Sequence, residues 1–168
     1  MPCKPRTHRR QAGAFAEFLV TATRHLVRTY YYSAPVHPDS TDEAKRAQQK
    51  FFGALHRTAY MEIRLGRLVR RDVRCEACGD HHQRYVEKGV DMYIGVDMLA
   101  GASKNLYDVA VLVTGDGDLI HAVKAVKDLG KHVELATFPI GRSDELASVA
   151  DVITELSLAN LKPLFIRP

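Results

Sequence analysis

Apolar and polar residues alternate in blocks along the chain, and the clearest block is a short β-rich run at Val109–Val113 that ends in polar residues. Five consecutive apolar residues are typical of a strand buried on both faces inside a parallel sheet. The run is followed by Thr-Gly-Asp-Gly-Asp, which includes the carboxylates Asp116 and Asp118. Open α/β sheets bind ligands beyond the carboxyl ends of their strands, so this position predicts a functional site.

The rest of the pattern predicts further helices and strands. Helical spacing or capping residues predict helices at 14–23, 40–56, from about 87 onward, 118–129 and 143–150. Alternating or β-branched runs predict strands at 26–32, 132–138 and 152–156, and a strand pair within 61–68 that bends at Gly66. Strand–helix–strand alternation through the second half predicts an α/β fold with a parallel, wound sheet.

Composition restricts the class of protein. The 168 residues suffice for one domain with a proper core, and 46% apolar with 26% charged residues is typical of a soluble globular protein. No apolar run approaches the roughly 20 residues of a membrane helix. The basic N-terminus has no apolar stretch directly behind it and does not resemble a secretory signal, so we expect a cytoplasmic protein with no membrane partner.

The net charge of +4 is concentrated in two places. Residues 1–10 hold four basic and no acidic residues, and we expect residues 1–13 to form a flexible basic arm. Between residues 57 and 74, Glu62 and Asp72 are the only acids beside a cluster of arginines: Arg57, Arg64, Arg67, Arg70, Arg71 and Arg74. Such a patch indicates either an anionic partner, most commonly nucleic acid, or a solvated, partly salt-bridged face.

The Asp116–Asp118 pair carries the strongest chemical signal. Two neighbouring carboxylates repel each other, and a divalent cation such as Mg²⁺ or Mn²⁺ relieves that repulsion. The alternative is that one of them caps the following helix, which explains one carboxylate but not both. Thr114 could add a hydroxyl ligand or simply cap the strand end.

The predicted helix before this strand carries two further aspartates, Asp91 and Asp97. Asp91 follows Lys88 by three residues and would share a helical face with it, so Lys88 could pair with Asp91 or bind phosphate. Asp97 lies about 120° round the helix from Asp91. Each aspartate is compatible with a site or with ordinary surface, and His121 is expected to be surface.

Cys75 and Cys78 form a C-x-x-C motif shortly before His81 and His82. Two thiolates and two imidazoles could hold a structural Zn²⁺. However, the histidines follow the cysteines so closely in sequence that the four side chains could not easily surround one ion. The alternative is a hairpin turn that carries cysteines. Three cysteines in a chain of this size do not indicate a disulfide framework.

With these residues in view, the run from Glu87 to Leu135 resembles the NYN domain family (LabA-like), within the PIN-like nuclease superfamily. The resemblance is carried by K-G-V-D, a helix with a further aspartate, and an apolar strand that ends in T-G-D-x-D. Upstream, LVRTYYYSAP and EIRLGRLV are similar to the family's second strand and hairpin region, and C-x-x-C-G also occurs in relatives. The resemblance covers roughly residues 24–156.

The resemblance implies a PIN-like three-layer α/β fold, with a mostly parallel central sheet and helices on both faces, over residues 14–168. It also implies an acidic cluster that binds Mg²⁺ or Mn²⁺ and cleaves RNA, with Asp91, Asp116 and Asp118 as catalytic metal ligands and Asp97 as a further ligand. The residues then expected to contact the RNA substrate are Lys88, Thr114, Arg64 and Arg67.

One part of the family pattern is missing. Relatives begin with an apolar strand of the form F-I-D-x-x-N, whereas no aspartate precedes Tyr30 here. We therefore expect an N-terminally incomplete domain, which either starts downstream of the true beginning or lacks this strand. An open sheet of this kind could recruit a strand from a second copy of the chain, which would make a homo-oligomer.

Three functions follow from these observations. The first is a metal-dependent RNA endonuclease, and the second is a catalytically inactive NYN domain that acts as an RNA-binding or regulatory module. The third is a nucleotide-sugar transferase, because D-x-D after a buried strand also occurs there. It ranks last because 168 residues leave little room for an acceptor-binding half.

Overall fold

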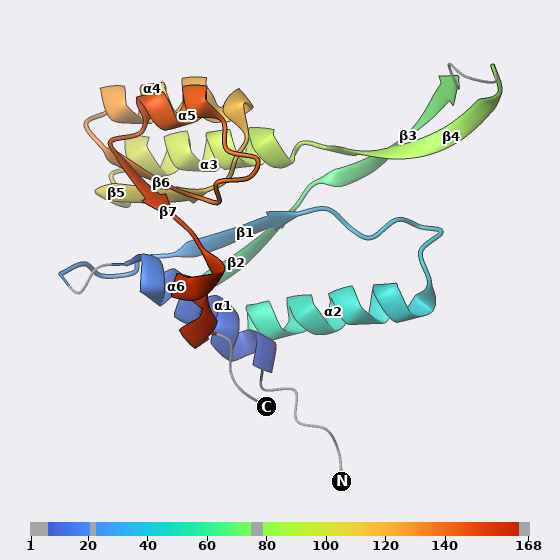
Figure 1. The fold of residues 1–168 in the computed structure, drawn as a ribbon, viewed down its shortest axis with the longest axis horizontal. Coiled ribbons are helices and arrows are strands. Elements are labelled where there is room, and N and C mark those ends of the chain that lie inside the picture. The colour runs from blue at the N-terminus through green and yellow to red at the C-terminus, as the bar shows by residue number, and fades with distance from the viewer. Residues whose placement is uncertain (1–6, 21–22, 75–78, 165–168) are drawn as a thin grey trace, which may run out of the picture.

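The computed structural model describes residues 7–20, 23–74 and 79–164 (Figure 1). The helices in this part of the chain are α1 (Thr7–Leu19), α2 (Asp42–His56), α3 (Val90–Ser103), α4 (Ile120–Asp128), α5 (Asp144–Val149) and α6 (Leu158–Leu161), with 3-10 turns η1 (Gly117–Leu119) and η2 (Lys162–Leu164). The strands are β1 (Thr29–Ser33), β2 (Met61–Leu65), β3 (Arg67–Arg74), β4 (His81–Lys88), β5 (Val109–Val113), β6 (His132–Thr137) and β7 (Val152–Glu155). The alternation of strands and helices predicted for the second half is confirmed.

The strands form three separate hydrogen-bonded groups. β5, β6 and β7 make a parallel sheet with β6 in the middle, and β1 pairs with β2, also in parallel. β3 and β4 form an antiparallel hairpin in which Arg67 lies opposite Lys88. The predicted α/β class with parallel strands is therefore confirmed.

Helices cover both faces of the three-stranded sheet, which gives the layered arrangement seen in Figure 1. Along β6, side chains alternate between the faces, as strand geometry requires. Val133 and Leu135 belong to a buried cluster with residues of α3, α4 and α5. Ala136 belongs to a second cluster, which α1 and α6 complete from the other face. The middle strand, β6, is thus buried between two helical layers.

The β1–β2 sheet is covered by α2, whose Leu55 is almost wholly buried. Tyr31 of β1 contacts Phe51 of α2 edge to face, with ring centroids 5.4 Å apart. The hydroxyl of Thr41 accepts a hydrogen bond from the Ala44 amide and caps α2. The helix predicted from residue 40 therefore begins slightly later, because Thr41 is the residue whose side chain reaches the first free amides.

The two parallel sheets do not pair with each other. Among the described residues, β1 pairs only with β2 and β5 only with β6. Helix α3 packs against β1 and β2 as well as α4, and so connects the two parts. β5 is therefore an edge strand. It is also not buried on both faces, as was predicted, because Leu112 is buried but Val113 is 46% exposed.

The hairpin corrects another prediction. The helix expected from residue 87 begins only at Val90, because Glu87 and Lys88 are the last residues of β4. Gly89 lies between β4 and α3 and has a φ of 91°, a conformation that favours glycine and ends the strand. Lys88 and Asp91 therefore do not share a helical face, and β4 was not predicted.

The N-terminal helix also starts earlier than the pattern predicts. α1 begins at Thr7 rather than at residue 14, so residues 7–13 of the expected basic arm are helical. Arginine, glutamine and alanine all favour helix, which explains the extension upstream of the apolar positions. In the described part of the chain, no helix is long and apolar enough to cross a membrane.

Candidate functional site

The acidic loop, residues 114–118, connects β5 to η1 at the carboxyl end of the three-stranded sheet. Asp116 caps η1, since its Oδ1 accepts a hydrogen bond of 2.9 Å from the Asp118 amide. The Asp116 amide in turn donates to the Thr114 hydroxyl at 3.1 Å. Capping thus occupies one oxygen of Asp116, and Asp118, two residues further on, is exposed. Thr114 shapes the loop rather than simply ending the strand.

Two glycines hold this loop against the segment that precedes α5. A Cβ on Gly115 would lie 2.0 Å from the Gly141 carbonyl oxygen, and one on Gly117 would lie 2.9 Å from the Ser143 hydroxyl oxygen. The Ser143 amide donates a 3.1 Å hydrogen bond to the Gly115 carbonyl. This close approach explains both glycines of T-G-D-G-D, and it fixes the backbone of Asp116 between them and of Asp118 directly after them.

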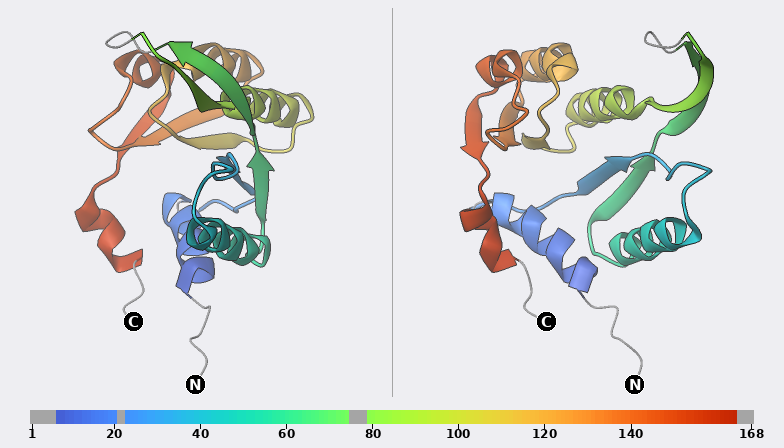
Figure 2. Two further views of the ribbon diagram at one scale, coloured as in Figure 1. Left: turned by 90° about the vertical axis from the view of Figure 1, so that its right-hand side faces the viewer. Right: turned by 45° about the vertical axis from the view of Figure 1, so that its right-hand side comes forward.

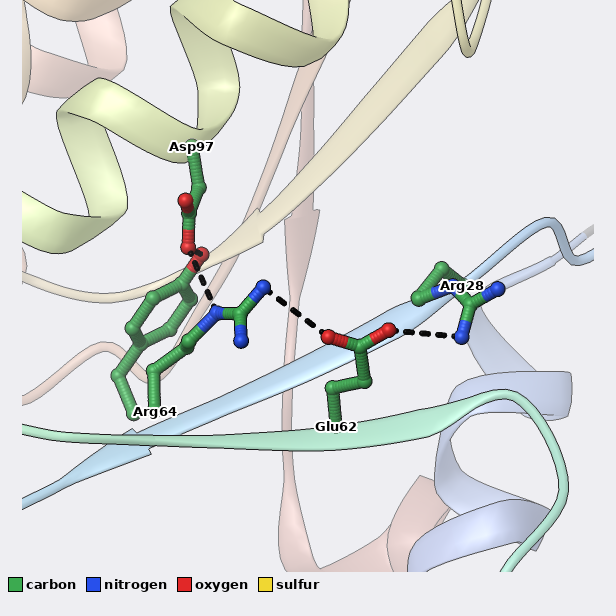
Figure 3. Close-up of polar contacts among 5 residues, drawn as sticks. Arg28, Glu62, Arg64 and Asp97 are labelled. Atoms are coloured by element: carbon green, nitrogen blue, oxygen red, sulfur yellow. Dashed lines mark hydrogen bonds and ion pairs between the residues drawn. The ribbon is translucent and has the colours of Figure 1, made fainter.

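Asp97 lies in a different environment, a polar network between α3 and the β1–β2 sheet (Figure 3). Its Oδ2 accepts hydrogen bonds from the Tyr32 hydroxyl at 3.0 Å and from the Arg64 Nε at 3.3 Å. Arg64 also pairs with Glu62 at 3.0 Å, and Glu62 pairs with Arg28 at 2.7 Å. The charge of Asp97 is thus balanced by protein groups.

Tyr32 is a fixed hydrogen-bond donor in this network. Burial, together with the hydrogen bond to Asp97, raises the pKa of Tyr32 far above its usual range. The phenol therefore keeps its proton at any physiological pH and holds the Asp97 carboxylate in place. The sequence predicted Asp97 and Arg64 but missed Tyr32, Glu62 and Arg28, because no local signal links residues 65 positions apart.

The four predicted acids do not converge. Asp116 and Asp118 are neighbours in the acidic loop, and α3, which carries the other two, packs against η1. Asp91 lies exposed in the first turn of α3, and no hydrogen bond joins it to another described residue. Within the described ranges, no three histidine, cysteine or acidic side chains form a group that could hold a metal ion.

The residues predicted to contact the substrate also have different environments. Arg64 is engaged by Glu62 and Asp97, and its guanidinium lies 5.3 Å from the centre of the Tyr30 ring. Arg67 and Lys88 are exposed and lie opposite each other at the base of the hairpin. Cys75 and Cys78, the possible zinc ligands, lie outside the described residues.

Comparisons with known proteins give a family and a fold. Residues 1–157 match the NYN domain family. A crystal structure of a protein of unknown function, VPA0982 from Vibrio parahaemolyticus RIMD 2210633, superposes with a TM-score of 0.57. It is 21% identical and the match covers 90% of this chain and 79% of that one. No curated protein matches significantly. The arrangement agrees with the predicted PIN-like three-layer α/β fold.

Proposed function

The chain belongs to the NYN domain family, whose members are generally nuclease-like, and from this premise we propose that it cleaves RNA phosphodiester bonds at the acidic loop. The supporting observation is the Asp116–Asp118 pair, held by Gly115 and Gly117 beyond the end of β5. Two carboxylates at the mouth of a parallel sheet are well placed to act on a ligand bound there. Arg67 and Lys88 are the exposed cations that we propose contact the RNA.

A divalent cation fits this donor set in one particular way. Mg²⁺ is commonly held by one or two carboxylates while waters and substrate phosphates complete its coordination. Asp116 and Asp118 would supply the carboxylates, and Thr114 would keep Asp116 in position. When bound, Mg²⁺ or Mn²⁺ would supply Lewis-acid stabilisation of the phosphate and a more acidic bound water. The pair fits a cation shared with the substrate, not a closed protein cage.

The second candidate is an RNA-binding or regulatory module that does not cleave. Its support is Asp97, which already accepts hydrogen bonds from Tyr32 and Arg64 and so has a protein counter-charge. Because Asp97 is engaged and no third acid among the described residues forms a metal-binding group with the pair, the acidic loop would have to act with two carboxylates alone. Both candidates share RNA as the ligand and differ in whether the acidic loop performs chemistry.

Cleavage of end-labelled single-stranded RNA in Mg²⁺ or Mn²⁺ separates the two. We expect the wild type to produce metal-dependent fragments and the D116N/D118N variant to lose at least about 100-fold in rate, as is usual when transition-state charge loses its stabilisation. The matched control is D108N/D128N, which removes the same charge at the opposite ends of β5 and α4. RNA binding without cleavage by the wild type would favour the second candidate.

A further inference from the structure

The β3–β4 hairpin projects from the rest of the molecule (Figures 1 and 2). Its two strands pair over eight residues each. Near its middle, Tyr85 contacts His37 of the loop after β1 edge to face, with ring centroids 4.4 Å apart. This contact identifies the face of the hairpin that is turned toward the body.

Strand alternation divides the hairpin residues between two faces. Tyr85 and its partner Arg70 share the inner face with Asp72 and Glu87. The opposite face carries four cations and no acid among its described side chains, and we call it the basic face: Arg67, Arg71, Arg84 and Lys88. Because Tyr85 packs toward the body, the basic face is turned away from it.

Like charges stand directly opposite each other on the basic face. Arg67 pairs in register with Lys88, and Arg71 pairs with Arg84. All four are exposed, and none forms an ion pair or side-chain hydrogen bond with another described residue. Like charges directly across a sheet are destabilising. Nothing in the described part of the fold compensates this repulsion. An anionic ligand would compensate it.

The spacing suits a ligand with regularly repeated anionic groups. The two cation pairs are four residues apart along each strand, which is about 13 Å in extended chain. Between them, Val69 and Val86 are only half-buried and present no competing charge. Guanidinium groups bind phosphate oxygens through paired hydrogen bonds, so Arg71 and Arg84 can engage one phosphate while Arg67 and Lys88 engage another.

We propose that the basic face binds the sugar–phosphate backbone of RNA. The proposal rests on the proposed function for the identity of RNA as the ligand, and it adds Arg71 and Arg84 as binding residues. It assigns to the hairpin a sequence-independent role, because phosphate contacts fix position without distinguishing bases.

The test compares two double variants of the full chain by fluorescence anisotropy with a labelled single-stranded RNA across a salt series. R71Q/R84Q removes the outer cation pair of the basic face. R70Q/R74Q removes two arginines from the inner face of the same hairpin, with the same change in net charge. We expect R71Q/R84Q to weaken binding about tenfold or more and to reduce the slope of log K against log salt by about 0.7, the value for one lost phosphate contact on a single strand. R70Q/R74Q should weaken binding less than about twofold on the same reasoning.

Thermal melting shows whether each variant is folded, and R71Q/R84Q should melt no lower than the wild type because it removes a repulsion. Equal losses in both variants, or no loss in R71Q/R84Q, would overturn the assignment of the basic face. If R71Q/R84Q lost binding to phosphatidylserine vesicles while its RNA binding was unaffected, RNA would be overturned as the ligand of the basic face. If R71Q/R84Q loses RNA binding but the wild type does not cleave, the basic face stands and the proposed cleavage fails.

Discussion

At the scale of residues, four aspartates that look equivalent in the sequence have three different environments. Asp116 and Asp118 share a tight loop, Asp97 is held by Tyr32 and Arg64, and Asp91 is exposed at the start of α3. The motif predicted their types and spacing but not their partners. Counter-charges arrive from strands distant in sequence, and local periodicity carries no information about them.

Replacing Tyr32 with phenylalanine tests the Asp97 network. Y32F removes a hydrogen bond to a charged, half-buried carboxylate, which is worth about 1.5–3 kcal/mol. We expect the free energy of unfolding in urea to fall by about that amount. Y60F is the control, because Tyr60 is 60% exposed and forms no side-chain hydrogen bond with another described residue. Equal effects of the two substitutions would mean that Tyr32 does not support Asp97.

Glu134 gives a pH-dependent prediction. Its side chain on β6 is buried and bonded to Arg24 at 2.8 Å, and this hydrogen bond lowers the pKa of Glu134 below its ordinary value of 4.5. A carboxylate with a depressed pKa contributes stability above its unfolded-state pKa and loses it as pH falls through the folded-state value.

We therefore expect the wild type to lose more unfolding free energy between pH 7 and pH 3 than E134Q does. The measurement is urea unfolding at both pH values, with E145Q as the control because Glu145 is exposed on α5. If E134Q and E145Q showed the same pH dependence as the wild type, the Arg24–Glu134 pair would contribute nothing to acid sensitivity.

At the scale of elements, the success of sequence prediction depends on how local the determining interactions are. β5, β6, β7 and the helices between them have clear periodicity and clear ends, such as Gly130 with φ of 78° after α4. β4 was missed because its residues are mostly polar. The exposure of Val113 was missed because it depends on which strand lies beside β5.

Gly115 tests how the acidic loop is held. G115A would place a Cβ 2.0 Å from a backbone oxygen, so the loop or the 141–143 segment must shift. We expect a loss of stability of about 1–3 kcal/mol, as for other overpacked sites, and a loss of any cleavage activity. Chemical denaturation and the RNA cleavage assay measure these two effects.

The control for this substitution is G53A, in the interior of α2. An added Cβ there meets only the Arg57 side chain, at 3.5 Å, and alanine favours helix, so stability should stay equal or rise by up to about 1 kcal/mol. A G115A variant as stable as G53A would contradict the close approach that we assign to the loop.

At the scale of the whole molecule, two parallel sheets are joined through α3, and a hairpin extends from them (Figure 2). The sequence predicted the α/β class and the acidic loop, because buried strands and G-D-G-D loops leave local signals. It could not predict that the parallel strands form two sheets or that four cations gather on one hairpin face. Both features depend on strand order and register.

The central claim is that the Asp116–Asp118 pair is the functional centre, and calorimetric titration of Mn²⁺ into the full chain tests it most directly. The account predicts a single saturable site in the wild type and in D108N/D128N, and its loss in D116N/D118N with folding retained by circular dichroism. No saturable binding by the folded wild type, or undiminished binding in D116N/D118N, would contradict the assignment of the cation to the acidic loop.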